Sequence, residues 1–162
     1  KGVLRKNKID VREPFVKKLI KLNPNIIFDI YGYKNKQPIW SNDFYDSLYK
    51  SKMALNLSRI NNVKYYSSNR IASLIGNGIL TFIDKNTKLN DFFSNDEVIF
   101  YKNISDLSEK INFYKHNNNK RNTIAKKGKE KYFRLFNNRI ISDYICAKIF
   151  ESKPKKLVSW MT

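Results

Sequence analysis

Short apolar runs alternate with amphipathic helical segments between residues 11 and 101, and this alternation restricts the fold more than any other feature of the sequence. The apolar runs are nearly continuous, as in strands that are buried on both faces. The predicted strands lie within residues 25–33, 53–58, 78–84 and 97–101, and the predicted helices within residues 12–22, 41–52 and 67–77. This order predicts an α/β fold, a doubly wound parallel sheet covered by helices.

Several helix ends carry local chemical signals. The pair Asn23-Pro24 predicts the end of the first helix, because proline cannot continue it. One of residues 41–43 is the expected cap of the second helix, and Phe44, Leu48 and Tyr49 are expected on one face of it. Gly76 and Gly78 are expected to let the chain turn from the third helix into the next strand.

The last third of the chain is predicted to be helical. Helices are expected within residues 106–116, 120–136 and 138–150, with Ser105 as the cap of the first and an asparagine-rich loop between the first two. The basic, proline-containing residues 151–162 are interpreted as a tail. We therefore expect one domain over residues 1–150, followed by this extension.

The chain has one cysteine and one histidine, and neither is expected to act in catalysis. Cys146 lies on a helix face and is interpreted as a buried apolar side chain, in a protein from a reducing compartment. His116 is expected to lie in a solvated loop. No stretch has the length of apolar sequence that a membrane span needs. Because the chain starts at Lys1, we expect it to be a piece of a longer protein.

The formal net charge is +18, from 32 lysines and arginines against 14 acidic residues. Such a surface attracts polyanions and anionic membrane faces. However, the basic residues are dispersed, and the many lysines, asparagines and isoleucines are typical of an AT-rich genome. Specific nucleic-acid binding is therefore not expected.

Polar residues follow the predicted strands, where ligands bind in open α/β sheets. Residues 32–33, 58–59 and 84–85 should meet at the carboxyl edge of the sheet. A helix start near residues 67–69 should point its free N–H groups the same way, and helix starts favour phosphate. With Arg59 and Arg70 nearby, these groups predict a diphosphate cradle. The alternative is that Ser67, Ser68 and Asn69 only cap the helix.

Other catalytic patterns are missing from the sequence. There is no nucleophile triad and no cysteine–histidine cluster for zinc, so no catalytic residue and no metal ligand is assigned. Asp43 and Asp46 fit an ordinary helix start. Aromatic residues gather near the proposed edge, where one or two could stack on a base or a sugar; they are Tyr31, Tyr33, Trp40, Tyr45, Tyr65 and Tyr66.

The order of these segments resembles the C-terminal half of GT-B glycosyltransferases, in the group 1 branch similar to the spore-maturation CgeB type. The resemblance runs from about Asp29 to Tyr144 and rests on the order and spacing of five segments. They are "IYGY", "FYDSLYKSKMALNLSR", "NRIASLIGNGILTFID", "LNDFFSNDEVIFYKNISDLSEKINFYKHNNNKR" and "IAKKGKEKYF". Arg70 takes the place of the family's arginine and Gly78 that of its glycine, whereas Ser73 stands where the family has a ribose-binding glutamate.

The resemblance implies a Rossmann-like half of a GT-B enzyme that binds a nucleotide-sugar donor without a metal or other cofactor. Arg59 and Arg70 would hold the diphosphate, with Ser67, Ser68 and Asn69 donating at the helix start. Ser73 would contact the ribose, Gly32 and Tyr33 would border the base, and Tyr65 is added to the substrate-binding set from its position.

The partners implied are a nucleotide-sugar, a glycan or lipid-linked acceptor, and an N-terminal domain of the same chain that carries the acceptor site and the catalytic base. The location implied is the bacterial cytoplasm or the inner face of the cell membrane, in the synthesis of cell-surface polysaccharides. A fucosyltransferase-like enzyme is one variant of this hypothesis, because those enzymes have a similar C-terminal half.

Two other functional classes remain open from the sequence. The first is a non-catalytic basic α/β module that binds an anionic polymer or membrane, which the charge and Ser73 favour. The second is a receiver-type phosphate-signalling domain. It is disfavoured, because Asp29, Asp43 and Asp84 do not converge in the predicted fold.

Overall fold

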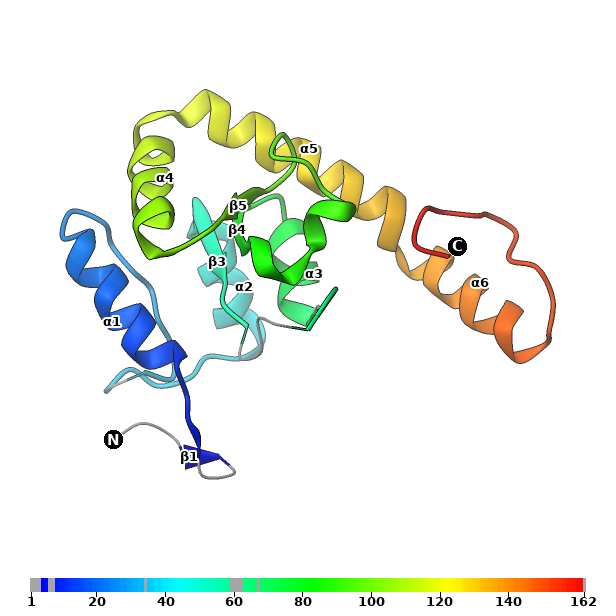
Figure 1. Cartoon of the computed structure of the whole chain (residues 1–162), viewed down its shortest axis with the longest axis horizontal. Coiled ribbons are helices and arrows are strands. Elements are labelled where there is room, and N and C mark those ends of the chain that lie inside the picture. The colour runs from blue at the N-terminus through cyan, green and yellow to red at the C-terminus, as the bar shows by residue number, and fades with distance from the viewer. Residues whose placement is uncertain (1–3, 6–7, 34, 59–62, 67, 162) are drawn as a thin grey trace.

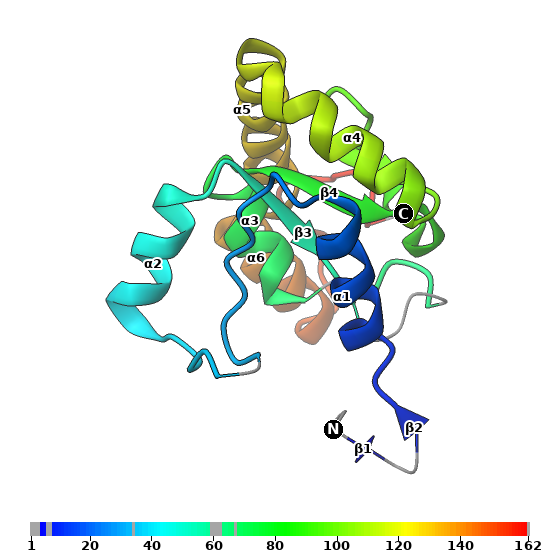
Figure 2. The ribbon, with the colours of Figure 1, turned by 90° about the vertical axis from the view of Figure 1, so that its left-hand side faces the viewer.

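The computed structural model describes residues 4–5, 8–33, 35–58, 63–66 and 68–161 (Figure 1). Its centre is a parallel sheet of three strands in the order β3 (Met53–Asn56), β4 (Leu80–Asp84) and β5 (Ile99–Tyr101). Leu55 pairs with Phe82, and Phe82 with Ile99. A two-stranded antiparallel hairpin, β1 (Leu4–Arg5) and β2 (Lys8–Ile9), lies apart from this sheet (Figure 2).

Helices cover both faces of the sheet. On one face, Phe82 and Tyr101 pack in a core cluster with Leu19 of α1 (Arg12–Leu22) and Leu107 of α4 (Ile104–His116). On the other face, Ile83 packs with α3 (Asn69–Ile75). The mixed α/β architecture with a parallel sheet is confirmed. The described strands run in consecutive order, without the reversal that defines a doubly wound sheet, so that finer arrangement stays a prediction.

The remaining helices are α2 (Ser41–Lys50), α5 (Asn118–Phe136) and α6 (Asn138–Ile149), and two 3-10 turns, Lys85–Thr87 and Leu89–Asp91, follow β4. α5 packs against Glu97, just before β5. α6 extends away from the C-terminal end of α5 (Figure 1). The tail returns to α5, where the Trp160 indole donates to the Leu135 carbonyl at 2.7 Å and stacks on Phe136. Within the described residues, every helix is too short or too polar to span a lipid bilayer.

The predicted strand at residues 25–33 is wrong. This segment is extended, and its burial alternates as in a strand, with Ile26 and Phe28 packed on the core and Ile27 92% exposed. It nevertheless pairs with no strand among the described residues, apart from one isolated bridge between Tyr33 and Lys36. A strand needs a hydrogen-bonded neighbour as well as a periodic sequence, and here the neighbour is missing.

Several local predictions also need correction. Trp40, not one of residues 41–43, is the residue that precedes α2, and its side chain makes no capping hydrogen bond. Tyr49 is 92% exposed. Asn103 caps α4, not Ser105, because its side chain reaches two free N–H groups of the first turn.

Three further corrections concern the C-terminal helices. The asparagine-rich loop is reduced to Asn117 between α4 and α5, and His116 is the last residue of α4. Cys146 is exposed, not buried, since α6 packs along Ile140 and Ala147 on another side of the helix.

Candidate active site

The carboxyl ends of the three parallel strands lie at one edge of the sheet, and each ends in a buried polar residue. β3 ends at Asn56 with Ser58 beyond it, β4 ends at Asp84, and β5 ends at Tyr101. Burial, followed by the charge of Asp84, raises the pKa of the Tyr101 hydroxyl. Buried polar groups normally have partners, so a cluster of them at a strand edge marks a candidate ligand site.

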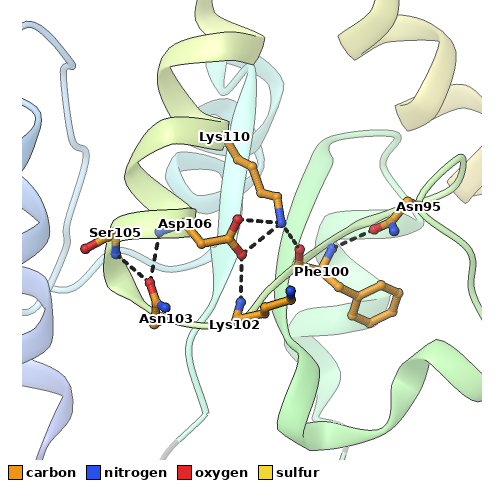
Figure 3. Close-up of polar contacts among 7 residues, drawn as sticks. All are labelled: Asn95, Phe100, Lys102, Asn103, Ser105, Asp106 and Lys110. Atoms are coloured by element: carbon orange, nitrogen blue, oxygen red, sulfur yellow. Dashed lines mark hydrogen bonds and ion pairs between the residues drawn. The ribbon is translucent and has the colours of Figure 1, made fainter.

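The start of α4, beside β5, is closed by its own side chains (Figure 3). Asn103 Oδ1 accepts hydrogen bonds from two backbone N–H groups of the first turn, each at 3.0 Å. Asp106 accepts from the Lys102 N–H at 2.8 Å and pairs with Lys110 at 2.9 Å. Lys110 also donates to the Phe100 carbonyl at 2.7 Å. These donors are already satisfied, so this part of the edge offers little to an incoming anion.

The start of α3, beside β3, has unused donors. Ser68 precedes the helix in an extended conformation, and its side chain makes no capping hydrogen bond. Its Oγ is buried without a partner among the described residues. Neither the nitrogen nor the oxygen of the Asn56 amide, at the end of β3, is hydrogen-bonded to a described residue, although Asn56 is 1% exposed. This part of the edge has the groups that a polar ligand could satisfy.

Two arginines lie near this open part of the edge. Burial lowers the pKa of the Arg70 guanidinium, and the positive charge of Arg12 lowers it further. Arg12 begins α1 and is bound by Asp10, with Nε to Oδ1 at 2.9 Å. Arg70 has no hydrogen bond or ion pair with the described residues. The two guanidinium groups are near enough for the charge of one to act on the other, and a bound anion would relieve that repulsion.

The other predicted residues of this helix have partners of their own. The Ser73 hydroxyl donates to the Asn69 carbonyl at 3.1 Å, one turn back in α3. Tyr65 has φ of 60° and lies against the turn after β4, where its N–H donates to the Thr87 carbonyl at 2.8 Å. The Tyr65 hydroxyl donates to Asp91 at 2.6 Å. Tyr65 therefore lies against the turns that follow β4, and Asn69 is the first residue of α3; a ligand role for either residue stays a prediction.

Gly32 and Tyr33 are not at the end of a strand, since the strand expected to place them does not form. Gly32 has φ of +70°, and a tight turn joins both residues to Lys36. Tyr33 lies near Lys17 of α1, whose ammonium pKa it helps to raise after the larger effect of Glu13. Arg59 and Ser67 lie outside the described residues.

The sequence reasoning missed Arg12 and Asn56. Asn56 is the one polar residue inside the apolar run 53–57, and a polar side chain in a buried strand is a recognisable signal. Arg12 lies two residues after Asp10, at the start of a predicted helix. No sequence pattern indicates that Arg12 comes close to Arg70.

Two hollows on the described surface lie at the opposite edge of the sheet, where the strands begin. One, of about 400 Å³, is lined by charged residues that include Glu97 and Lys131. The other, of about 510 Å³, lies between Tyr45 of α2 and Gly78 before β4. In the part of the chain that the structure describes, no cluster of three or more acidic, histidine or cysteine side chains could hold a metal ion.

A family model described as glycosyl transferase-like matches residues 5–147, a range that includes the sheet and all but the end of α6. A search of curated proteins and a search of solved structures each gave no match.

Proposed function

The chain belongs to the glycosyl transferase-like family, and from that premise we propose that it is the donor-binding domain of a glycosyltransferase. The proposed donor is a nucleotide-sugar, bound at the carboxyl edge of the sheet without a metal. A Rossmann-like domain of residues 1–150, followed by the tail 151–162, would form the C-terminal half of a GT-B enzyme. The acceptor, a glycan or lipid-linked molecule, would bind the N-terminal half at the cytoplasmic face of the membrane.

The observation that carries this proposal is the pair of neighbouring guanidinium groups, Arg12 and Arg70, beside unused donors at the start of α3. A diphosphate would bring negative charge to the Arg70 guanidinium, on which the positive charge of Arg12 acts unfavourably. Arg70 would contact the diphosphate directly, while Arg12, held by Asp10, would add charge from the other side. The Ser68 hydroxyl would donate to a phosphate oxygen.

In the proposed reaction, the bond between the sugar's anomeric carbon and the diphosphate oxygen breaks, and an acceptor hydroxyl oxygen bonds to that carbon. The nucleoside diphosphate gains negative charge as it leaves, and the arginines stabilise that charge. The proton of the acceptor hydroxyl would pass to a base in the N-terminal half. No catalytic residue is assigned in this chain.

The remaining sequence-predicted residues have subsidiary parts in the proposal. Arg59, Ser67 and Asn69 would complete the diphosphate contacts. Ser73 would contact the ribose, and because its proton is directed to the Asn69 carbonyl, its oxygen would accept a hydrogen bond there. Tyr65, Gly32 and Tyr33 would border the base.

The test is nucleotide binding by the chain and by an Arg70→Ala variant. Titration with UDP, GDP and their sugars should shift amide resonances around residues 56–73. Loss of one charge-assisted contact should weaken nucleotide binding roughly tenfold to a hundredfold. Arg139→Ala removes an exposed arginine from α6 and is the matched control, with affinity expected to be unchanged. Equal affinities for Arg70→Ala and wild type would remove Arg70 from the site.

The net charge of +18 favours a second candidate, a non-catalytic module for anionic polymers or membranes. In that case, binding would spread over many lysines and decline steeply with salt. A nucleotide site would instead retain most of its affinity at raised salt and show shifts confined to the carboxyl edge. Comparing titrations at low and high salt separates the two functions.

A further inference from the structure

Asn56 is buried in a way that a purely structural residue rarely is. It is 1% exposed, and neither its Nδ2 nor its Oδ1 has a hydrogen-bond partner among the described residues. A buried amide without partners destabilises a fold, because it loses its hydrogen bonds to water without replacing them. An apolar side chain of similar size would be more stable there, unless the amide meets a ligand.

The register of the sheet shows which side Asn56 faces. Asn56 pairs with Ile83, and side chains at paired positions project from the same face. Ile83 packs with Ile71 and Ile75 of α3. Asn56 is therefore on the α3 face, at the carboxyl end of its strand. Ser68 is the residue before α3, and its buried Oγ also has no hydrogen-bond partner among the described residues.

We propose that Asn56 is a ligand-contact residue whose Nδ2 donates to a phosphate oxygen of the bound diphosphate. This inference rests on the proposed function and adds to it a neutral, buried donor at the carboxyl end of β3, on the α3 face of the sheet. The Ser68 hydroxyl donates to the same diphosphate. Phosphate oxygens only accept hydrogen bonds at neutral pH, and the amide nitrogen and the hydroxyl are donors, so the chemistry is complementary.

A neutral donor and a charged one affect binding differently. The contribution of Arg70 weakens as salt rises, because salt screens charges. The contribution of Asn56 depends on a short contact and should change little with salt. The affinity ratio between wild type and an Asn56 variant is therefore expected to be constant from low to high salt, whereas the ratio for Arg70→Ala falls.

The experiment measures the binding of inorganic pyrophosphate, UDP and GDP by calorimetry, together with the melting temperature. Asn56→Leu removes the unpaired amide at similar volume, and Asn122→Leu makes the same change at an exposed position of α5 as the control. Asn56→Leu should weaken pyrophosphate binding roughly tenfold or more while the melting temperature is unchanged or higher. Asn56→Ala removes the same donor without added bulk and is used if the leucine variant does not fold.

The outcomes distinguish a failure of the Asn56 inference from a failure of the proposed function. Wild type that binds pyrophosphate, UDP or GDP while both Asn56 variants bind it equally well overturns the inference and leaves the donor site in place. A lowered melting temperature with unchanged affinity assigns Asn56 a structural role and also overturns it. Wild type that binds none of these probes overturns the proposed function and the inference together.

Discussion

Gly128 of α5 packs directly against the backbone of Glu97, and replacing Gly128 with alanine tests that close contact. A Cβ at this position would lie 2.1 Å from the Glu97 carbonyl oxygen and 3.2 Å from its carbonyl carbon. Ile75 of α3 is the next neighbour, at 3.5 Å. The nearest atoms belong to backbone just before β5, so rotating a side chain cannot relieve the clash.

The magnitude follows from two opposed effects. Restoring an ordinary carbon–oxygen separation requires α5 to move by about 1 Å. Overpacking of this kind costs about 3 kcal/mol when backbone must shift, the upper end of the usual range. Alanine returns about 1 kcal/mol because it is the better helix former. We therefore expect Gly128→Ala to lower the free energy of unfolding by about 2 kcal/mol.

The assay is urea unfolding followed by circular dichroism, supported by thermal melts. A loss of about 2 kcal/mol corresponds to a melting temperature lower by about 4–8 °C in a domain of this size. Lys126→Ala, at an exposed position of the same helix, is the control and should stay within about 0.5 kcal/mol of wild type. If Gly128→Ala is as stable as wild type, or more stable, α5 does not approach the Glu97 carbonyl this closely.

Two further predictions concern the carboxyl edge. Tyr101→Phe removes a buried hydroxyl that has no hydrogen-bond partner among the described residues. The free energy of unfolding should therefore rise by about 1 kcal/mol in urea titrations, and a clear loss would mean that the hydroxyl is bonded. Burial alone would raise the pKa of Asp106, but the hydrogen bonds from Lys110 and Lys102 lower it overall. Its stabilising effect is therefore present above about pH 4 and lost as the pH falls through the lower, folded-state pKa. Asp106→Asn should then reduce the stability difference between pH 6 and pH 3 by about 0.2–1 kcal/mol, and an unchanged difference would contradict this.

Local chemistry made much of the fold predictable. The helix at Arg12–Leu22 ends where Asn23-Pro24 stops it, and the strands at 80–84 and 99–101 were recognisable as apolar runs. Each of these signals lies within a few residues of the element that it specifies. Residues 25–33 had an equally good local pattern and yet form no ladder, because pairing depends on a distant neighbour.

The candidate site likewise contains residues that the sequence could place and residues that only the structure could place. Ser68, Asn69 and Arg70 could be placed at a helix start from the sequence, because helix capping is a local property. The approach of Arg12 to Arg70 depends on how α1 and α3 sit on the two faces of the sheet. Cys146 shows the same limit for burial, since only the packing of α6 decides which side of that helix is covered.

The amino-acid sequence by itself determined the order of the helices and of the three strands of the sheet, the starts of α1 and α3, and a basic protein with polar residues at the carboxyl edge of its sheet. Only the tertiary structure decided that Asn56 is buried without a partner among the described residues, and that Arg12 of α1 approaches Arg70 of α3. The physical reason is that periodicity and capping act over a few residues. The pairing of charges, the burial of an amide and the choice of strand neighbour depend on segments that folding brings together.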